Sequence, residues 1–381
     1  MKILYLHIGS TLGSGKANIV SVLSICKTFV DNGIKIDLVL NKPGFEISDL
    51  EIYIRENFNF DLNFNIIFSN PKFGIKRFDK YLYNYEINRI IQGNDADFVF
   101  LRTPYFIENI IKSGKRVIFE SHNNQMHDRY SFVDNYWKRK IVRLSSSNYF
   151  ALFVSISKNL ENYWRKKGIP ESKLIAVHGG YLTEKFSIKV EKSKARKKLG
   201  IPQNEKIVMY VGSLYPDREI DNILILAKEI PNVTFYIIGG PEKNKKHFEK
   251  LVDIMGLLNV KLLGPIPHSQ VPSYLYSSDV LLALWSPKVP TMDYCSPLKV
   301  FEYMASGQTI VAHNFPTIRE ILEDNINALL VDPHNIGDLI STVKKIADNN
   351  PKFLGKNARD RAIKYHSWNF KVDQIKKRLL I

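Results

Sequence analysis

The chain has 381 residues, of which 45% are hydrophobic and 24% are charged, a balance that excludes a disordered protein. This length exceeds what one hydrophobic core usually organises, so we expect two domains. The formal net charge of +16 is compatible with anionic lipid headgroups or nucleic acid as partners, and equally with a solvated basic surface. No apolar run is long enough to cross a membrane.

The chain begins with an apolar run, 3–8, that is too short for a signal peptide and has no small-residue cleavage site. Its two cysteines, Cys26 and Cys295, form neither a disulfide framework nor a metal-binding pattern. We therefore expect a cytoplasmic protein.

Short apolar, β-rich runs alternate with longer segments of helical periodicity along the whole chain. Such continuous apolar runs are typical of parallel strands covered on both faces, and their alternation with helices predicts doubly wound α/β domains. The predicted strands are 3–8, 36–40, 66–69, 98–101, 117–120, 150–156, 174–177, 207–212, 233–238, 260–263, 280–284, 310–312 and 328–331.

A charged, helix-favouring stretch over 184–199, followed by a Gly-Ile-Pro turn, separates the two halves. We place one Rossmann-like domain over 1–185 and a second over 190–360. The tail, 358–381, is basic and amphipathic, with Trp368 and Phe370 available to dock it. Ligands of such folds bind at the carboxyl ends of the strands, so we expect the functional residues in the loops that follow strands.

The first such loop contains Gly9, Gly13, Gly15 and Lys16. A P-loop would require a glycine at position 10 and a hydroxyl at position 17, which are serine and alanine here. A dinucleotide fingerprint would require a different glycine spacing. We interpret the loop as a flexible, glycine-rich segment that faces the space between the domains.

Residues 296–307 read Ser-Pro-Leu-Lys-Val-Phe-Glu-Tyr-Met-Ala-Ser-Gly. Ser296 is a good N-cap, Pro297 suits the first helical position, and Gly307 suits the left-handed turn that ends a helix. Free amides at the helix start, with Lys299 beside them, predict an anion site. Glu302 lies on the same face and could accept hydrogen bonds from sugar hydroxyls. Together they indicate a nucleoside diphosphate.

This segment closely resembles the donor-binding motif of retaining glycosyltransferase family 4, whose members have the GT-B fold, two Rossmann-like domains facing across a cleft. The resemblance covers nearly the whole chain and implies a second domain that binds the nucleotide-sugar donor and a first that binds the acceptor. It also implies that the tail helix, 361–381, returns to the first domain.

The resemblance assigns catalytic roles to His122, Arg218, Lys299 and Glu302. Lys299 and Arg218 would neutralise the diphosphate, Glu302 would hold the ribose, and His122 would contact the sugar. The remaining donor contacts would come from Gly212, Ser213, Gly240, Gly264, Ser296, Pro297 and Leu298, and Gly13 and Gly15 would form the acceptor-side loop.

The departure from much of that family that matters most is at position 294. The family often has a second glutamate eight residues before Glu302, where this chain has Tyr294. Asp293 is the neighbouring carboxylate that could substitute for it in holding the donor sugar. The family also usually has a basic residue where this chain has Ser213.

The resemblance therefore predicts a retaining glycosyltransferase of the hexosyltransferase type, acting in cell-surface polysaccharide or glycolipid synthesis. We expect a nucleotide-diphosphate sugar as co-substrate, a glycan or lipid-linked acceptor, no metal, no other cofactor and no nucleic-acid partner. Basic residues interleaved with aromatics favour peripheral contact with the inner face of an anionic membrane. The clusters are Lys72, Lys76, Arg77 and Lys80, and Lys138, Arg139, Lys140 and Arg143.

Three other functions stay open from the sequence. A catalytically inactive protein that binds lipid or nucleic acid would fit the charge and the missing glutamate. An epimerase of the same architecture would share the donor motif. A nucleotide-dependent oxidoreductase is disfavoured because the dinucleotide fingerprint is absent.

Overall fold

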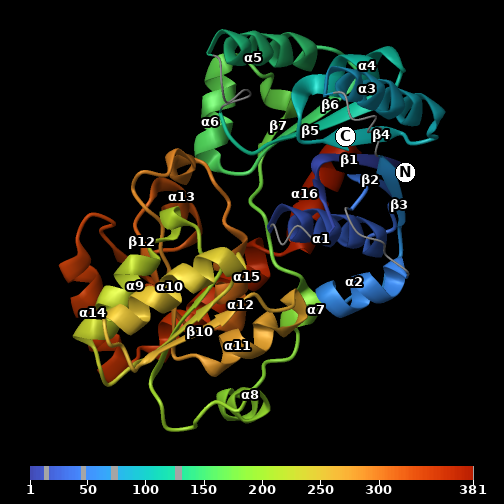
Figure 1. Cartoon of the computed structure of the whole chain (residues 1–381). Coiled ribbons are helices and arrows are strands. Elements are labelled where there is room, and N and C mark those ends of the chain that lie inside the picture. Colours follow the sequence, from blue (N-terminus) through green and yellow to red (C-terminus); the bar gives the residue numbers. More distant parts are fainter. Residues whose placement is uncertain (13–16, 44–48, 70–75, 125–130, 381) are drawn as a thin grey trace.

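The computed structural model describes residues 1–12, 17–43, 49–69, 76–124 and 131–380. Within these residues the chain forms two parallel sheets with helices interleaved between the strands (Figure 1). All thirteen predicted strands are present, which confirms the predicted α/β class. No helix in these ranges is both long and apolar enough to span a membrane.

The first sheet has the strand order β3-β2-β1-β4-β5-β6-β7, with every neighbouring pair parallel. Its direction of winding reverses between β1 and β4, the switch point at which such sheets bind ligands. The strands are β1 (Lys2–Thr11), β2 (Lys35–Asn41), β3 (Asn65–Ser69), β4 (Phe98–Leu101), β5 (Arg116–Ser121), β6 (Phe150–Ser155) and β7 (Leu174–Ala176).

The second sheet repeats this winding, with the order β10-β9-β8-β11-β12-β13 and a switch point between β8 and β11. Its strands are also parallel, which places their carboxyl ends along one edge. They are β8 (Ile207–Val211), β9 (Thr234–Ile238), β10 (Val260–Gly264), β11 (Val280–Ala283), β12 (Thr309–His313) and β13 (Leu329–Val331).

Helices cover both faces of each sheet, and each sheet is therefore buried between two apolar clusters. The helices of the first half are α1 (Ala17–Asp31), α2 (Leu50–Phe58), α3 (Lys76–Gly93), α4 (Ile107–Lys112), α5 (Ser131–Ser145) and α6 (Lys158–Lys167). Those that follow are α7 (Thr183–Phe186), α8 (Lys192–Leu199), α9 (Ile220–Glu229), α10 (Glu242–Ile254), α11 (Val271–Ser277), α12 (Leu298–Ser306), α13 (Pro316–Ile321), α14 (Ile336–Asp348), α15 (Lys352–Tyr365) and α16 (Trp368–Leu379). Short 3₁₀ turns are η1 (Pro104–Phe106), η2 (Glu171–Lys173), η3 (Pro216–Arg218), η4 (His268–Gln270) and η5 (Pro290–Asp293).

The chain crosses between the two sheets twice, and the two crossings lie side by side. Tyr181 forms a parallel bridge with Ser367, through hydrogen bonds of 3.1 Å from the Tyr181 amide to His366 O and from the Trp368 amide to Tyr181 O. A Cβ at Gly180 would lie 2.5 Å from the Ser367 carbonyl carbon, so only glycine fits there.

After the second crossing, α16 lies against α1 and β6 of the first half, where Figure 1 shows it in red among blue elements. The tail region predicted as one helix over 361–381 is divided: residues 361–365 end α15, and α16 begins after Ser367, whose hydroxyl accepts from the Phe370 amide.

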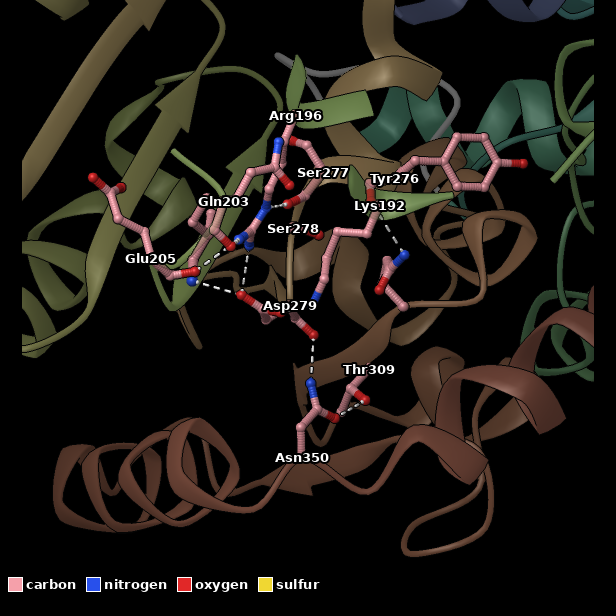
Figure 2. A network of polar contacts seen from close by, with 12 residues as sticks. Lys192, Arg196, Gln203, Glu205, Tyr276, Ser277, Ser278, Asp279, Thr309 and Asn350 are labelled. Carbon is pink, nitrogen blue, oxygen red and sulfur yellow. Dashed lines mark hydrogen bonds and ion pairs between the residues drawn. The ribbon is translucent and has the colours of Figure 1, made fainter. Parts of the chain in front are cut away.

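The linker helix α8 is fixed to the second sheet by a buried arginine (Figure 2). Arg196, 2% exposed, donates to the carbonyls of Ser277, Gln203 and Glu205 at 2.7–2.9 Å and to Asp279 Oδ2 at 2.8 Å. Asp279 also pairs with Lys192 and accepts from the Ile207 amide. This network lies at the amino ends of β8 and β11, so its role is structural.

Candidate active site

The strongest site feature is a partly buried cation at the switch point of the second sheet. The Lys299 ammonium lies 4.2 Å from the Tyr210 ring centroid, 4.3 Å from that of Trp285 and 3.2 Å from Tyr210 Oη. Tyr210 belongs to β8, and Trp285 follows β11. Electron-rich ring faces attract a cation, which is why the ammonium is held there.

Arg218 adds a second positive charge near the Lys299 ammonium. Burial, and then the charge of Arg218, lower the pKa of Lys299 well below its ordinary value. Within the part of the chain that the structure describes, no carboxylate forms an ion pair with Lys299, and Arg218 pairs only with Asp217, at 3.0 Å. A bound anion would relieve the repulsion between the two cations.

The backbone amides at the start of α12 are a further group that could bind an anion at this site. In the described residues no side chain caps this helix, and Gly307 ends it in the left-handed conformation, as predicted. Our prediction that Ser296 is the N-cap and Pro297 the first helical residue is wrong. Pro297 is itself the cap residue, with an extended backbone, and the helix begins at Leu298.

Ser296 has a different partner, across the interface between the two halves. Its hydroxyl accepts from the Gly179 amide at 2.7 Å and lies 3.3 Å from Nδ1 of His178. The other His178 nitrogen lies 2.9 Å from Glu320 Oε2. Glu320, on α13, accepts from the amides of Lys158 and Asn159 at the start of α6. This group fastens the first half to the loop that precedes α12.

Glu302 lies one turn after Lys299, and its side chain is 15% exposed. Its Oε1 is 2.8 Å from Nε2 of His268, and Nδ1 of His268 is 2.7 Å from the Lys185 ammonium. Burial alone would raise the pKa of Glu302, but His268 and Lys185 outweigh burial and hold it below its usual value. Glu302 is therefore a carboxylate.

His122 directly follows β5, as predicted, and its side chain is 42% exposed. Its Nε2 lies 2.6 Å from Oε1 of Glu120, a fully buried carboxylate. Glu120 also pairs with Arg102 at 2.9 Å and with Lys371 of α16 at 2.6 Å. Burial would raise the pKa of Glu120, yet the Lys371 and Arg102 charges hold it well below its usual range. Partial desolvation, and then the charge of Arg102, lower the pKa of His122, while Glu120 opposes this shift.

The predicted glycine turns lie together at the carboxyl ends of β8, β9 and β10. The Gly212 amide donates to Ile238 O, the Gly239 amide to Gly264 O, and the Leu214 amide to Gly240 O, at 2.7–2.9 Å. A Cβ at Gly239 would lie 1.7 Å from Gly212 O, so this close approach requires glycine. Ser213 Oγ accepts from Arg218 Nε at 3.2 Å, which orients the guanidinium.

The structure thus gathers Gly212, Ser213, Arg218, Lys299 and the start of α12 around one switch point. Loops of the two sheets also meet, because Asn124 donates to Tyr294 Oη at 2.7 Å. Gly13 and Gly15 lie outside the described residues. Asp293 is exposed, and only its carbonyl has a described partner, Asn159.

Several site residues were missed from the sequence. Trp285 and Arg102 directly follow predicted strands, and that position could have identified them. His268, Lys185, Glu320 and Lys371 have partners far away in the chain, and no local pattern marks them. Among the described residues, no three His, Cys, Asp or Glu side chains gather as they would around a metal ion.

The second half of the chain, which contains Arg218, Lys299 and Glu302, is similar to known proteins. Residues 191–366 match the model of the family Glycosyl transferases group 1. The D-inositol 3-phosphate glycosyltransferase of Mycolicibacterium smegmatis is 27% identical over 209 residues, 54% of this chain and 46% of that protein. That of Mycobacterium tuberculosis strain F11 is 26% identical over 175 residues, 45% of this chain and 35% of that protein. The chain spans less than half the length of these relatives.

Solved structures match the whole chain. Anabaena HepE in complex with UDP and glucose superimposes with a TM-score of 0.74 at 17% identity, covering 100% of this chain and 99% of that one. Sucrose-phosphate synthase of Thermosynechococcus elongatus gives 0.76 at 16% identity, with the same coverage. WaaG, a glycosyltransferase involved in lipopolysaccharide biosynthesis, gives 0.68 at 13%, again with 100% and 99% covered. The fold of this chain is GT-B, as predicted.

Proposed function

We propose that the chain is a retaining glycosyltransferase of family 4 that transfers a sugar from a nucleotide-diphosphate sugar to a hydroxyl acceptor. The observation that carries this proposal is the partly buried Lys299 ammonium near Arg218, at the switch point and next to the uncapped start of α12. The match over residues 191–366 to Glycosyl transferases group 1 supports it.

In the proposed reaction, the bond between the anomeric carbon and the diphosphate oxygen breaks while the acceptor oxygen bonds to the same face of that carbon. The acceptor's proton passes to the departing diphosphate. Negative charge grows on the diphosphate in the transition state, so Lys299, Arg218 and the α12 amides would stabilise it without rearranging. His122 would contact the transferred sugar, and Glu302 the ribose. We propose that no metal takes part.

The test is nucleotide release from a panel of nucleotide-diphosphate sugars, followed without acceptor as slow hydrolysis. We expect Lys299→Ala and Arg218→Ala each to lower turnover by about 10²–10³, the usual loss for one charge-stabilising donor. The control is Lys228→Ala, an exposed residue of α9. Full activity in either site variant would contradict the assignment of the diphosphate.

The same assay separates the alternatives. A binding protein without activity would release no nucleotide, and an epimerase would return an altered nucleotide sugar. Activity that survives EDTA is expected, and activity restored only by added Mg²⁺ would contradict the proposed metal independence.

We further propose that the acceptor is lipid-linked or close to an anionic membrane, and that α5 provides the contact. Phe132, Tyr136, Arg139 and Arg143 follow one another at helical spacing, with Phe132 71% and Tyr136 56% exposed. Of the predicted basic cluster, Lys138 and Lys140 pair with Asp134 and Glu108, which leaves the two arginines to carry the attraction. Replacing both by glutamate should abolish flotation with phosphatidylglycerol vesicles, while phosphatidylcholine vesicles should bind neither protein.

A further inference from the structure

Lys185, His268 and Glu302 form a chain of polar contacts across three elements. Lys185 comes from α7, in the segment between the domains, His268 from η4, and Glu302 from α12. The Lys185 ammonium lies 2.7 Å from His268 Nδ1, and His268 Nε2 lies 2.8 Å from Glu302 Oε1. The side chains of His268 and Glu302 are 20% and 15% exposed, so their positions are strongly constrained.

The chemistry of these groups fixes where the protons are. An ammonium has only N–H donors, so Nδ1 of His268 must accept. In the neutral ring Nε2 then carries the hydrogen and donates it to Glu302. Burial lowers the pKa of Lys185 to about 8, against the attraction of Glu302 and Glu184, so the amine is mostly charged at neutral pH.

We propose that His268 and Lys185 are positioning residues for Glu302. His268 holds one carboxylate oxygen, and the other is left to accept hydrogen bonds from the ribose hydroxyls of the donor. This inference rests on the proposed function, and it adds two residues that the donor motif itself does not contain.

The position of Lys185 in α7 connects the Glu302 carboxylate to the first half of the molecule. The preceding residue, Glu184, pairs with Lys27 of α1 at 2.6 Å. Two neighbouring residues of one short helix are thus attached to opposite halves. A shift of α7 together with the first half would therefore move Lys185 away from His268.

The first test needs no nucleotide. In the full chain labelled with ¹⁵N-histidine, His268 is identified as the signal lost in His268→Gln. We expect a neutral ring protonated at Nε2 at pH 7. In Lys185→Met the Glu302 carboxylate still requires the hydrogen on Nε2, while Nδ1 loses the ammonium that prevented its protonation, so we expect a larger share of rings protonated at both nitrogens. Lys185→Arg should restore the neutral form. A wild-type ring protonated at Nδ1, or at both nitrogens, would overturn the proposal.

The second test measures affinity for UDP, GDP and ADP against their 2′,3′-dideoxy forms. We expect wild type to prefer the hydroxylated form of the nucleotide it binds. His268→Gln and Lys185→Met should each reduce that preference about 10-fold, the worth of one hydrogen bond to a charged group. His247→Gln, on the exposed surface of α10, is the control.

The outcomes distinguish the two proposals. A wild type that binds none of the three nucleotides contradicts the proposed function and the ribose role together. If the wild type binds one nucleotide and its dideoxy form equally well, only the positioning role is contradicted. The same holds if the His268 and Lys185 variants keep the full preference for the ribose hydroxyls.

Discussion

Lys299 and Glu302 lie three residues apart on α12 and carry opposite charges, yet each has other partners. Lys299 lies against two aromatic rings, and Glu302 binds His268. On an exposed helix such a pair would interact with each other and contribute little. In the function that we propose, this separation lets the positive and the negative group contact different parts of the same donor.

At the residue scale, the buried Arg196 allows a clear stability prediction. Arg196→Met removes the donor to three carbonyls and to Asp279, whose side chain is 20% exposed. We expect the free energy of unfolding to fall by about 1–3 kcal/mol, the usual cost of removing a hydrogen-bond partner, because Asp279 keeps Lys192 and the Ile207 amide. The measurement is urea unfolding.

The matched control is Lys197→Met, on the exposed side of the same helix. It should change the free energy of unfolding by no more than about 0.5 kcal/mol. Equal effects of the two substitutions would mean that the Arg196 network contributes nothing specific.

At the scale of elements, one carboxylate satisfies a helix end that belongs to the other half of the molecule. Glu320 of α13 accepts from two amides at the start of α6 and also binds His178. Burial would raise the pKa of Glu320, but His178 and the amides hold it below its usual value, so the charge that suits a helix N-terminus is present. The halves are joined here by electrostatics rather than by apolar packing alone.

Glu320→Gln should therefore lower the free energy of unfolding by about 1 kcal/mol, because an amide complements the helix end less well than a carboxylate. Hydrogen exchange at the amides of Lys158 and Asn159 should become faster. Glu229→Gln, an exposed substitution on α9, serves as the control. Unchanged exchange at α6 would show that Glu320 does not hold the helix end.

The strands could be predicted from the sequence because continuous apolar runs have few structural alternatives. Lys299 and Arg218 could be predicted because each lies within a local pattern. Glu320 and Lys371 could not. Lys371 is 1% exposed and pairs with Glu120, but in an amphipathic, basic tail a lysine is expected in solvent. The sequence also predicts the wrong partner for Ser296. Its hydroxyl accepts from the Gly179 amide, which is remote in sequence, so a local capping pattern cannot reveal this contact.

At the scale of the whole molecule, buried neutral histidines make stability depend on pH. Burial, with lesser effects of His178 and Arg361, lowers the pKa of His366 to about 3, and the pKa of His7 is also about 3. Their unfolded values are near 6.5, so the unfolded chain binds more protons below that pH. Stability is therefore lost as the pH falls from about 6.5 toward 3.

His366→Phe tests this dependence and keeps an aromatic ring against Phe301. The ring centroids of His366 and Phe301 are 5.2 Å apart. Neither ring nitrogen of His366 has a hydrogen-bond partner among the described residues, so the substitution removes no such bond. The loss of stability between pH 6 and pH 4 should become smaller by about 1.4 kcal/mol per pH unit. His334→Phe, at an exposed position, should leave the slope unchanged, and an unchanged slope in His366→Phe would contradict the assignment.

The pairing of Lys371 with the buried Glu120 also bears on how the protein is made. Synthesis on the ribosome proceeds from the amino end, and the second sheet lies between these two partners in the chain. β5 therefore emerges with a carboxylate whose lysine has not yet been translated. The first domain becomes complete only after the second has emerged, so a ribosome stalled before α16 would hold a finished second domain beside an unfinished first domain.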